Sequence, residues 1–268
     1  MKNKIRGEFI LKFLIVGDVC GRPGREAFRK YVPELKKEHN IDVVVVNGEN
    51  IAGGRGISRK TLDEIYRAGA DIVTSGNHIW DQKEIVSFID DEPFLIRPAN
   101  YPEGAPGKGY CIYPFKAKNI GVINVSGRTF MPPMDCPFQK VDEILKEIKN
   151  KCDIILVDIH AEATSEKIAM GFYLDGKVTC VVGTHTHVQT ADNRILPKGT
   201  AYISDLGMVG PYNSSLGINV NNAIDKFITC RPVRFEMAEG PNIFSAVVLE
   251  LAEDNSVKSF ERILFNEE

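Results

Sequence analysis

The chain has 268 residues, of which 43% are hydrophobic and 26% charged. This composition is that of an ordinary globular protein, and the length is common for a single large α/β sandwich or barrel. The formal net charge of −3 provides no basic excess for binding long nucleic acid through its phosphates. A local metal charge can nevertheless attract a small anion. We expect one domain over residues 1–268.

The N-terminal residues and the cysteines indicate where in the cell the protein is expected. The apolar run near the N-terminus is short, is interrupted by Lys12 and ends at Asp18 without a small-residue cleavage site. We interpret residues 1–11 as an N-terminal extension before a strand, not as a signal peptide. No stretch approaches the roughly 20 apolar residues of a membrane helix, so we expect no membrane partner. Six cysteines without a C-x-x-C pair indicate reduced thiols in a cytoplasmic protein.

The first third of the chain alternates strand and helix patterns. Runs rich in Val and Ile predict strands over residues 13–19, 42–50 and 71–78. Helical periods separate them over residues 24–40 and 58–70, and Ser58 is a cap for the second helix. This βαβαβ order predicts parallel strands that are buried on both faces and joined by right-handed crossovers.

The remaining residues predict a second set of strands. Short strands are expected over residues 110–115 and 119–127, and a helix over residues 138–151. Strands then follow over residues 153–162, 177–188 and 199–207, with a short helix between the first two. Residues 242–268 predict a hairpin with a turn at residues 253–256. Two sheets packed face to face with helices outside would use all of these elements.

Five of the predicted strands end in polar residues that can bind metal. Parallel strands would bring these ends to one edge, where ligands bind in open α/β sheets. Each residue alone has an ordinary explanation, such as a turn, a helix cap or a core histidine, but their joint occurrence favours a metal centre. The residues are Asp18, Glu49, Asn50, Asn77, His78, His160, His185 and His187.

The types of ligand indicate the chemistry. Imidazole, carboxylate and amide oxygen suit Fe, Mn, Zn or similar ions, and the absence of clustered thiolates argues against a structural zinc site. The ligands are too many for one tetrahedral ion and suit two, with Glu49 as a bridge. Two ions ~3.5–4 Å apart can hold a hydroxide and bind the oxygens of an in-line phosphoryl displacement.

The motifs GDVCG, GEN, GNH, VDIHAE and GTHTHVQ occur in this order. With them the chain resembles the calcineurin-like metallophosphoesterases, and within these the YmdB-like branch, whose members are described as 2′,3′-cyclic nucleotide phosphodiesterases. The resemblance extends from about Lys12 to the C-terminus and includes GENIAGGRGIS and SDLGMVGP. Cys20 stands where the wider superfamily has a histidine, and Glu49 replaces its bridging aspartate, as in the YmdB-like branch. The resemblance implies a four-layer α/β/β/α sandwich.

The resemblance also implies a role for each site residue. His78 would not be a ligand but would donate a proton to the leaving alkoxide, an effect of about 10²–10⁴-fold. Two nearby cations oppose its protonation, so it needs a carboxylate partner, for which Asp81 is a candidate. Alternatively, His78 only orients Asn77. One metal would be held by Asp18, Glu49, Asn50 and His187, and the other by Glu49, Asn77, His160 and His185.

We therefore predict a dimetal phosphodiesterase that hydrolyses 2′,3′-cyclic AMP or a related small phosphoester. A metal-bound hydroxide would attack phosphorus, and His78 would protonate the leaving oxygen. The two ions are expected to be Fe or Mn, with Zn or Mg as alternatives. The alternative functions are a phosphomonoesterase or nucleotidase with the same centre, and a metal-binding regulatory protein with incidental activity. The resemblance also allows a homo-oligomer.

Four further features of the sequence each allow two interpretations. The GGRG segment at residues 53–56 either cradles a phosphate at a helix start, with Arg55 touching the anion, or only forms a turn. Cys20 either binds metal or packs in the interior. Trp80 and Phe130 either stack on a base or belong to the core. Residues 127–137 either line the pocket or form an oligomer contact.

Overall fold

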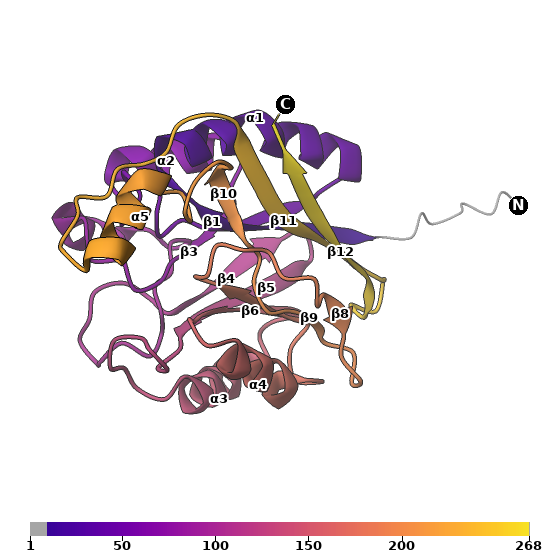
Figure 1. Ribbon diagram of the computed structural model, residues 1–268. Helices are drawn as coiled ribbons and strands as arrows, with labels where there is room; N and C mark the ends of the chain where they lie inside the picture. Colours follow the sequence, from indigo (N-terminus) through magenta and orange to yellow (C-terminus); the bar gives the residue numbers. More distant parts are fainter. Residues whose placement is uncertain (1–9, 268) are drawn as a thin grey trace, which may run out of the picture.

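The computed structural model describes residues 10–267. Two six-stranded sheets pack face to face, and helices cover the outer face of each (Figure 1). This arrangement is the α/β/β/α sandwich expected from the sequence. Residues 1–9 of the expected N-terminal extension lie outside the described residues, whereas Leu11, also assigned to it, begins the first strand. Among the helices of residues 10–267, none has the length and apolar character needed to cross a membrane.

The first sheet has the strand order β12-β11-β10-β1-β2-β3. Strands β1, β2 and β3 pair in parallel, as predicted, and β10, which was not predicted, pairs in parallel with the end of β1. The predicted C-terminal hairpin is formed by β11 and β12. The strands are β1 (Leu11–Val19), β2 (Val43–Asn47), β3 (Ile72–Thr74), β10 (Met208–Pro211), β11 (Asn242–Leu251) and β12 (Val257–Asn266).

The second sheet has the strand order β4-β5-β6-β7-β9-β8. Its inner strands β5, β6, β7 and β9 are parallel, and the edge strands β4 and β8 are antiparallel to their neighbours. The strands are β4 (Tyr110–Phe115), β5 (Lys118–Ser126), β6 (Ile154–His160), β7 (Cys180–Thr184), β8 (Arg194–Ile195) and β9 (Ala201–Ile203).

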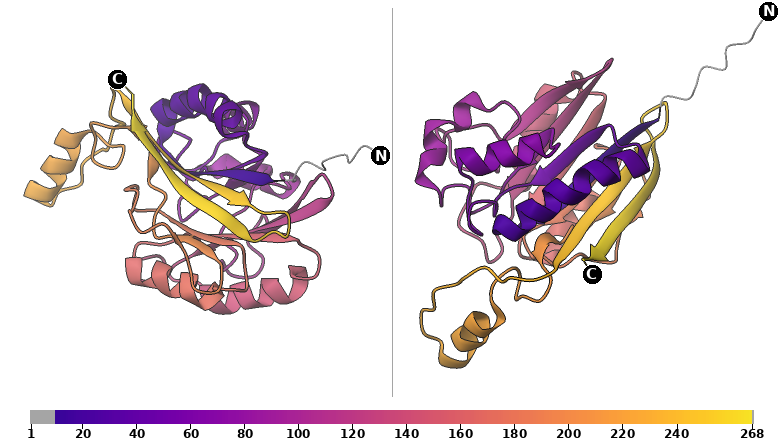
Figure 2. Two further views of the ribbon diagram at one scale, coloured as in Figure 1. Left: turned by 90° about the vertical axis from the view of Figure 1, so that its right-hand side faces the viewer. Right: turned by 90° about the horizontal axis from the view of Figure 1, so that it is seen from above.

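Two helices cover each sheet, and a further helix stands apart. On the first sheet lie α1 (Gly21–His39) and α2 (Arg59–Arg67), and on the second lie α3 (Pro137–Ile148) and α4 (Thr164–Leu174) (Figure 1). Ser58 caps α2 as predicted, and its hydroxyl accepts a hydrogen bond from the Thr61 amide. The helix α5 (Val220–Thr229), which was not predicted, projects away from both sheets (Figure 2). Two short 3₁₀ turns, η1 (Lys83–Ser87) and η2 (Ile89–Asp91), follow β3.

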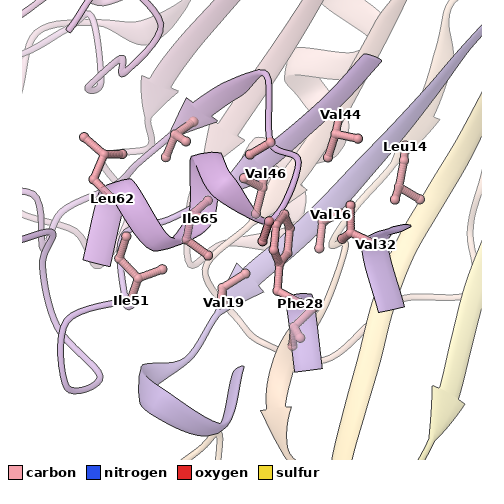
Figure 3. Close-up of a cluster of buried hydrophobic side chains, with 14 of the residues drawn as sticks. Leu14, Val16, Val19, Phe28, Val32, Val44, Val46, Ile51, Leu62 and Ile65 are labelled. Atoms are coloured by element: carbon pink, nitrogen blue, oxygen red, sulfur yellow. The ribbon is translucent and has the colours of Figure 1, made fainter. Parts of the chain in front are cut away.

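The continuous apolar runs of the strands are explained by burial on both faces. On β1, Leu14 and Val16 face outward into the cluster that includes Phe28 and Val32 of α1 (Figure 3). Between them in sequence, Phe13 and Ile15 face inward and join the core between the two sheets. Each such side chain contributes about 1.5–3 kcal/mol when fully buried. Alternation of polar and apolar residues is therefore absent from these strands.

Several predicted strands end earlier than expected, and in three of them this places candidate ligands outside the strand. Strand β7 ends at Thr184, not at residue 188, so His185 and His187 follow it. Strand β2 ends at Asn47, not at residue 50, and β3 ends at Thr74, not at residue 78. The side-chain Oδ1 of Asn47 accepts a hydrogen bond of 3.0 Å from the amide of Glu49, which is the geometry of an Asx turn. The chain therefore leaves the sheet just before Glu49 and turns its carboxylate toward the site.

Candidate metal centre

The structure brings the ends of five strands together where the two sheets meet. The sequence placed these ends on one edge of parallel strands, but the structure divides them between both sheets. A hydrogen bond of 3.1 Å from Asn47 to Asp158 joins β2 to β6 beneath the site. The first sheet supplies Asp18, Glu49, Asn50, Asn77 and His78, and the second supplies His160, His185 and His187.

Glu49 belongs to two groups of side chains at once. Its Oε2 lies 3.1 Å from Nε2 of His160. The first group consists of Glu49, His160 and His185, and the second of Asp18, Glu49 and His187. In each group, one possible ligand atom from every residue lies within 4.8 Å of the others. A carboxylate shared by two such groups would contribute to the binding of an ion in each.

The group around His160 converges on one point. Nε2 of His160 lies 3.0 Å from Nδ1 of His185 and 3.1 Å from Oδ1 of Asn77. The opposite nitrogens face outward: Nδ1 of His160 lies 2.9 Å from the Thr184 hydroxyl. Nε2 of His185 lies 3.2 Å from the carboxylate of Glu162. Metal-binding imidazoles have this arrangement, with one nitrogen toward the ion and the other held by an oxygen.

The group around Asp18 contains buried oxygens that need a partner. Within the described part of the chain, Oδ1 of Asp18 and Oδ1 of Asn50 are buried and form no hydrogen bond. Nδ1 of His187 lies 3.1 Å from the Leu216 carbonyl oxygen, which leaves Nε2 for another partner. Because a buried oxygen without a partner is costly, a cation between these side chains would fit the donor set.

The charges of the site are perturbed by burial and by one another. Burial raises the pKa of Asp18 to about 7 against the opposing effect of His187. Burial acts to raise the pKa of Glu49 as well, but His160 and other imidazoles lower it to about 2. Burial together with His160 lowers the pKa of His185 to about 3, so its ring is neutral at pH 7. A neutral imidazole can bind metal, and a cation beside Asp18 would favour its ionised form.

The loop after β7 holds its two histidines in an uncommon backbone conformation. The φ angles are 99° at His185 and 64° at His187. Asp205 fixes the loop, because its Oδ2 accepts hydrogen bonds of 3.1 and 2.7 Å from the amide and the hydroxyl of Thr186. The same oxygen lies 2.8 Å from Nζ of the buried Lys167. Strain of this kind persists only where the surroundings enforce it and is typical of functional sites.

Gly76, in the GNH motif, leaves room for the centre. A Cβ atom at this position would lie 2.3 Å from Oε2 of Glu49 and 2.3 Å from Nε2 of His160. No side chain can be accommodated at such distances without displacing one of the two candidate ligands. Glycine therefore allows the backbone to pass directly beside the shared carboxylate.

His78 lies on the pocket over the candidate ligands. Its Nδ1 lies 2.9 Å from Oδ2 of Asp81, which is the contact expected from the sequence. With Nδ1 engaged, Nε2 is the nitrogen that a bound molecule can meet. The pocket has a volume of about 280 Å³, and Arg55, Cys20 and Glu162 also line it.

The GGRG segment forms a turn and not a helix start. The helix α2 begins only at Arg59. The amide of Gly54 donates to the Asn50 carbonyl at 3.1 Å, and the amide of Arg55 donates to the Ala52 carbonyl at 3.3 Å. The phosphate cradle at a helix start is therefore wrong, although Arg55 does line the pocket as anticipated.

The cysteine and the two aromatic residues have different surroundings. Trp80 packs edge-on against Tyr101 with ring centroids 5.6 Å apart and contacts the core, which confirms its packing role. Phe130 is 90% exposed, so the core interpretation is wrong for this residue. Cys20 is buried, and its Sγ lies 3.6 Å from Nδ1 of His187.

Three charged residues at the site were not singled out from the sequence. Glu162 stands in the VDIHAE motif just after β6, and Asp205 stands in SDLGMVGP just after β9. Both follow buried strands in the same way as the candidate ligands, and this position in the sequence could have identified them as site residues. Lys167 lies within α4, where a lysine is ordinary, and only its burial against Asp205 distinguishes it.

Comparison with known proteins supports a common ancestry over nearly the whole chain. The model of the family described as "YmdB-like protein" matches residues 14–263. A curated protein of Bacillus subtilis (strain 168), named 2′,3′-cyclic-nucleotide 2′-phosphodiesterase, is 51% identical over 260 residues. That match covers 96% of this chain and 98% of the B. subtilis protein.

Two solved structures have nearly the same fold. A structure described as a novel phosphatase of Mycoplasma pneumoniae has a TM-score of 0.92 at 35% identity, covering 97% of this chain and 95% of its own. A hypothetical protein from Thermus thermophilus has a TM-score of 0.91 at 40% identity, covering 96% of this chain and 100% of its own. The fold and the chain length are thus shared with these proteins.

Proposed function

The chain belongs to the family of YmdB-like proteins and is a phosphoric ester hydrolase, and we propose that it is a two-metal phosphodiesterase acting on 2′,3′-cyclic AMP or a related cyclic nucleotide. The observation that supports the metal centre most strongly is that Glu49 belongs to two converging groups of ligands. The substrate class is taken from the activity named for the B. subtilis relative.

The chain's own residues would hold the two ions. The mixture of imidazole, carboxylate and amide donors suits Mn or Fe, with Zn or Mg as alternatives. When bound, the ions would supply the Lewis acidity that activates water and neutralises charge on the phosphate. One ion would be held by Asp18, Glu49, Asn50 and His187, and the other by Glu49, Asn77, His160 and His185.

Hydrolysis of the cyclic ester requires a proton at the leaving oxygen. The oxygen of water forms a bond to phosphorus, the bond from phosphorus to one ribose oxygen breaks, and a nucleoside monophosphate results. His78 lines the pocket and would donate the proton from Nε2. Asp81 would hold the ring through Nδ1 and stabilise its protonated form. Arg55 would attract the anionic phosphate.

Metal analysis and turnover of 2′,3′-cyclic AMP on the same sample test this proposal. We expect about two transition-metal ions per chain and hydrolysis that a chelator abolishes and Mn²⁺ or Fe²⁺ restores. AMP and a nitrophenyl phosphate serve as comparison substrates, because a phosphomonoesterase would prefer them. Two bound ions without hydrolysis of any of these substrates would favour the metal-binding regulatory protein. Absence of both metal and hydrolysis after adding Mn²⁺ or Fe²⁺ would reject the proposed metal centre itself.

A further inference from the structure

A second cavity adjoins the pocket over the candidate metal centre and shares part of its lining. Its volume is about 520 Å³, compared with about 280 Å³ for the pocket itself. Gly54, Arg55, Ile218 and Met237 line both. Sites for small molecules have volumes of about 300–1,000 Å³. The pocket alone thus has the size of a small ligand site, and the second cavity offers room for a further group attached to that ligand.

One wall of the second cavity is an arm, residues 216–237, which includes α5. The neck of the arm is a short antiparallel pair, in which the Asn219 amide donates to the Glu236 carbonyl and the Ala238 amide to the Gly217 carbonyl, each at 2.9 Å. Beyond the neck, α5 stands off the body of the protein (Figure 2). The second cavity lies between this arm and the loop of residues 52–55.

The arm is fixed to the loop and to a candidate ligand. A Cβ atom on Gly54 would lie 2.6 Å from Sδ of Met237, so the lack of a side chain at Gly54 allows the arm to pack closely on the loop. The carbonyl of Leu216 accepts the hydrogen bond of 3.1 Å from Nδ1 of His187. The second cavity therefore has a defined position relative to the phosphate that would be cleaved.

The walls of the second cavity combine cations with apolar groups. Within residues 10–267, the side chains of Arg55 and Lys226 form neither an ion pair nor a hydrogen bond. Phe235 is 38% exposed and lines the cavity with Val233, whereas Glu236 adds one negative charge. An exposed aromatic ring beside cations is the combination on which proteins bind single-stranded nucleotides.

We propose that the second cavity binds a second nucleotide, so that the preferred substrate is a short RNA fragment ending in a 2′,3′-cyclic phosphate. This inference rests on the proposed function. In such a fragment the cyclic phosphate occupies both the 2′ and the 3′ oxygen of the last ribose, so the chain continues only through the 5′ oxygen. With the cyclic phosphate at the metal centre, the base of the preceding nucleotide stacks on Phe235, and the phosphate that links the two nucleotides meets Arg55 and Lys226.

The overall charge of the protein agrees with a short fragment. A formal net charge of −3 gives no extended basic surface to follow a long backbone. The two cations of the cavity suffice for the one phosphate that links an added nucleotide. A dinucleotide is therefore the smallest molecule that tests the inference.

The experiment compares kcat/KM of the metal-loaded protein for 2′,3′-cyclic AMP and for adenylyl-adenosine 2′,3′-cyclic phosphate. We expect the dinucleotide to have the higher kcat/KM by about tenfold or more, through a lower KM, because stacking of one base contributes on this scale. Hydrolysis of both at equal kcat/KM would overturn the inference and leave the proposed function intact. Hydrolysis of neither would instead overturn the proposed function.

Two variants test whether the preference for the dinucleotide arises in the second cavity. Lys226→Glu and Phe235→Ala should each reduce the ratio of the two kcat/KM values toward one. Arg231→Glu is the matched control, because it makes the same charge change on the arm at an exposed residue outside the walls of the cavity, and it should keep the ratio of the unaltered protein. A dinucleotide preference that persists in both Lys226→Glu and Phe235→Ala would place the second nucleotide elsewhere and overturn the assignment.

Discussion

Nδ1 of His78 lies 2.9 Å from Oδ2 of Asp81, and the backbone amide of His78 donates to Oε2 of Glu49 at 3.2 Å. The residue is therefore held on both sides, by a carboxylate at the ring and by the shared candidate ligand at the backbone. The same arrangement suits a ring that acts on substrate and a ring that binds metal, and mutation separates the two roles.

The first prediction concerns this ring. His78→Ala should lower kcat by about 10²–10⁴-fold, because the leaving oxygen loses its proton donor, while the metal content stays unchanged. Asp81→Asn should lower kcat by about 10–100-fold, since it weakens only the support of the ring. Kinetics and metal analysis of the same preparations check both. A loss of metal in His78→Ala would instead make His78 a ligand or the support of one.

Glu49 should be required for both ions. Glu49→Ala removes the carboxylate that belongs to both groups, so we expect both ions to bind weakly and hydrolysis to disappear. Metal titration by calorimetry measures this loss directly, without activity. His187→Ala is the comparison, because it removes a member of only one group. Two tightly bound ions in Glu49→Ala would rule out the bridge.

Gly76→Ala should damage the site without a change in any candidate ligand. The added Cβ would lie 2.3 Å from Glu49 and from His160, so these side chains must move apart, and we expect the metal content to fall. Gly104→Ala is the control, because its Cβ would meet nothing within 4 Å. That variant should keep its metal and lose only about 1 kcal/mol of stability from the strained backbone. Normal metal binding by Gly76→Ala would contradict the geometry.

Asp205 should matter for stability as well as for the site. Asp205→Ala leaves Lys167 buried without its partner, which typically costs about 3–5 kcal/mol. It also releases Thr186, and with it the loop that contains His185 and His187. Denaturant unfolding and metal titration measure the two effects. Lys167→Met with Asp205→Asn, which removes both charges, should recover much of the stability but not the metal affinity. Unfolding of Asp205→Ala at the same denaturant concentration as the original protein would refute the prediction.

The sequence predicted most strands because their burial is a local pattern. Runs such as that of residues 13–19 carry apolar side chains at every position but Gly17 and Asp18, and only strands covered on both faces tolerate this. Ser58 and the turn at residues 253–256 were equally accessible, since caps and turns depend on neighbouring residues. The helix α5 was overlooked although its apolar residues Val220, Ala223, Ile224, Phe227 and Ile228 follow a helical period. Of these only Ala223 is buried, so what the sequence could not show is that this face stays unpacked.

The sequence by itself determined which residue types follow the buried strands, and this was enough to nominate Asp18, Glu49 and the histidines. Tertiary structure alone decided that these ends come from two sheets and that Asp205 reaches Lys167 and Thr186. It also brings Glu49 into both groups, as the sequence led us to expect. The physical reason is the distance along the chain over which each effect acts. Strand and turn preferences depend on adjacent residues, whereas the burial of a charge and the partner that offsets it depend on segments that meet only in the folded chain.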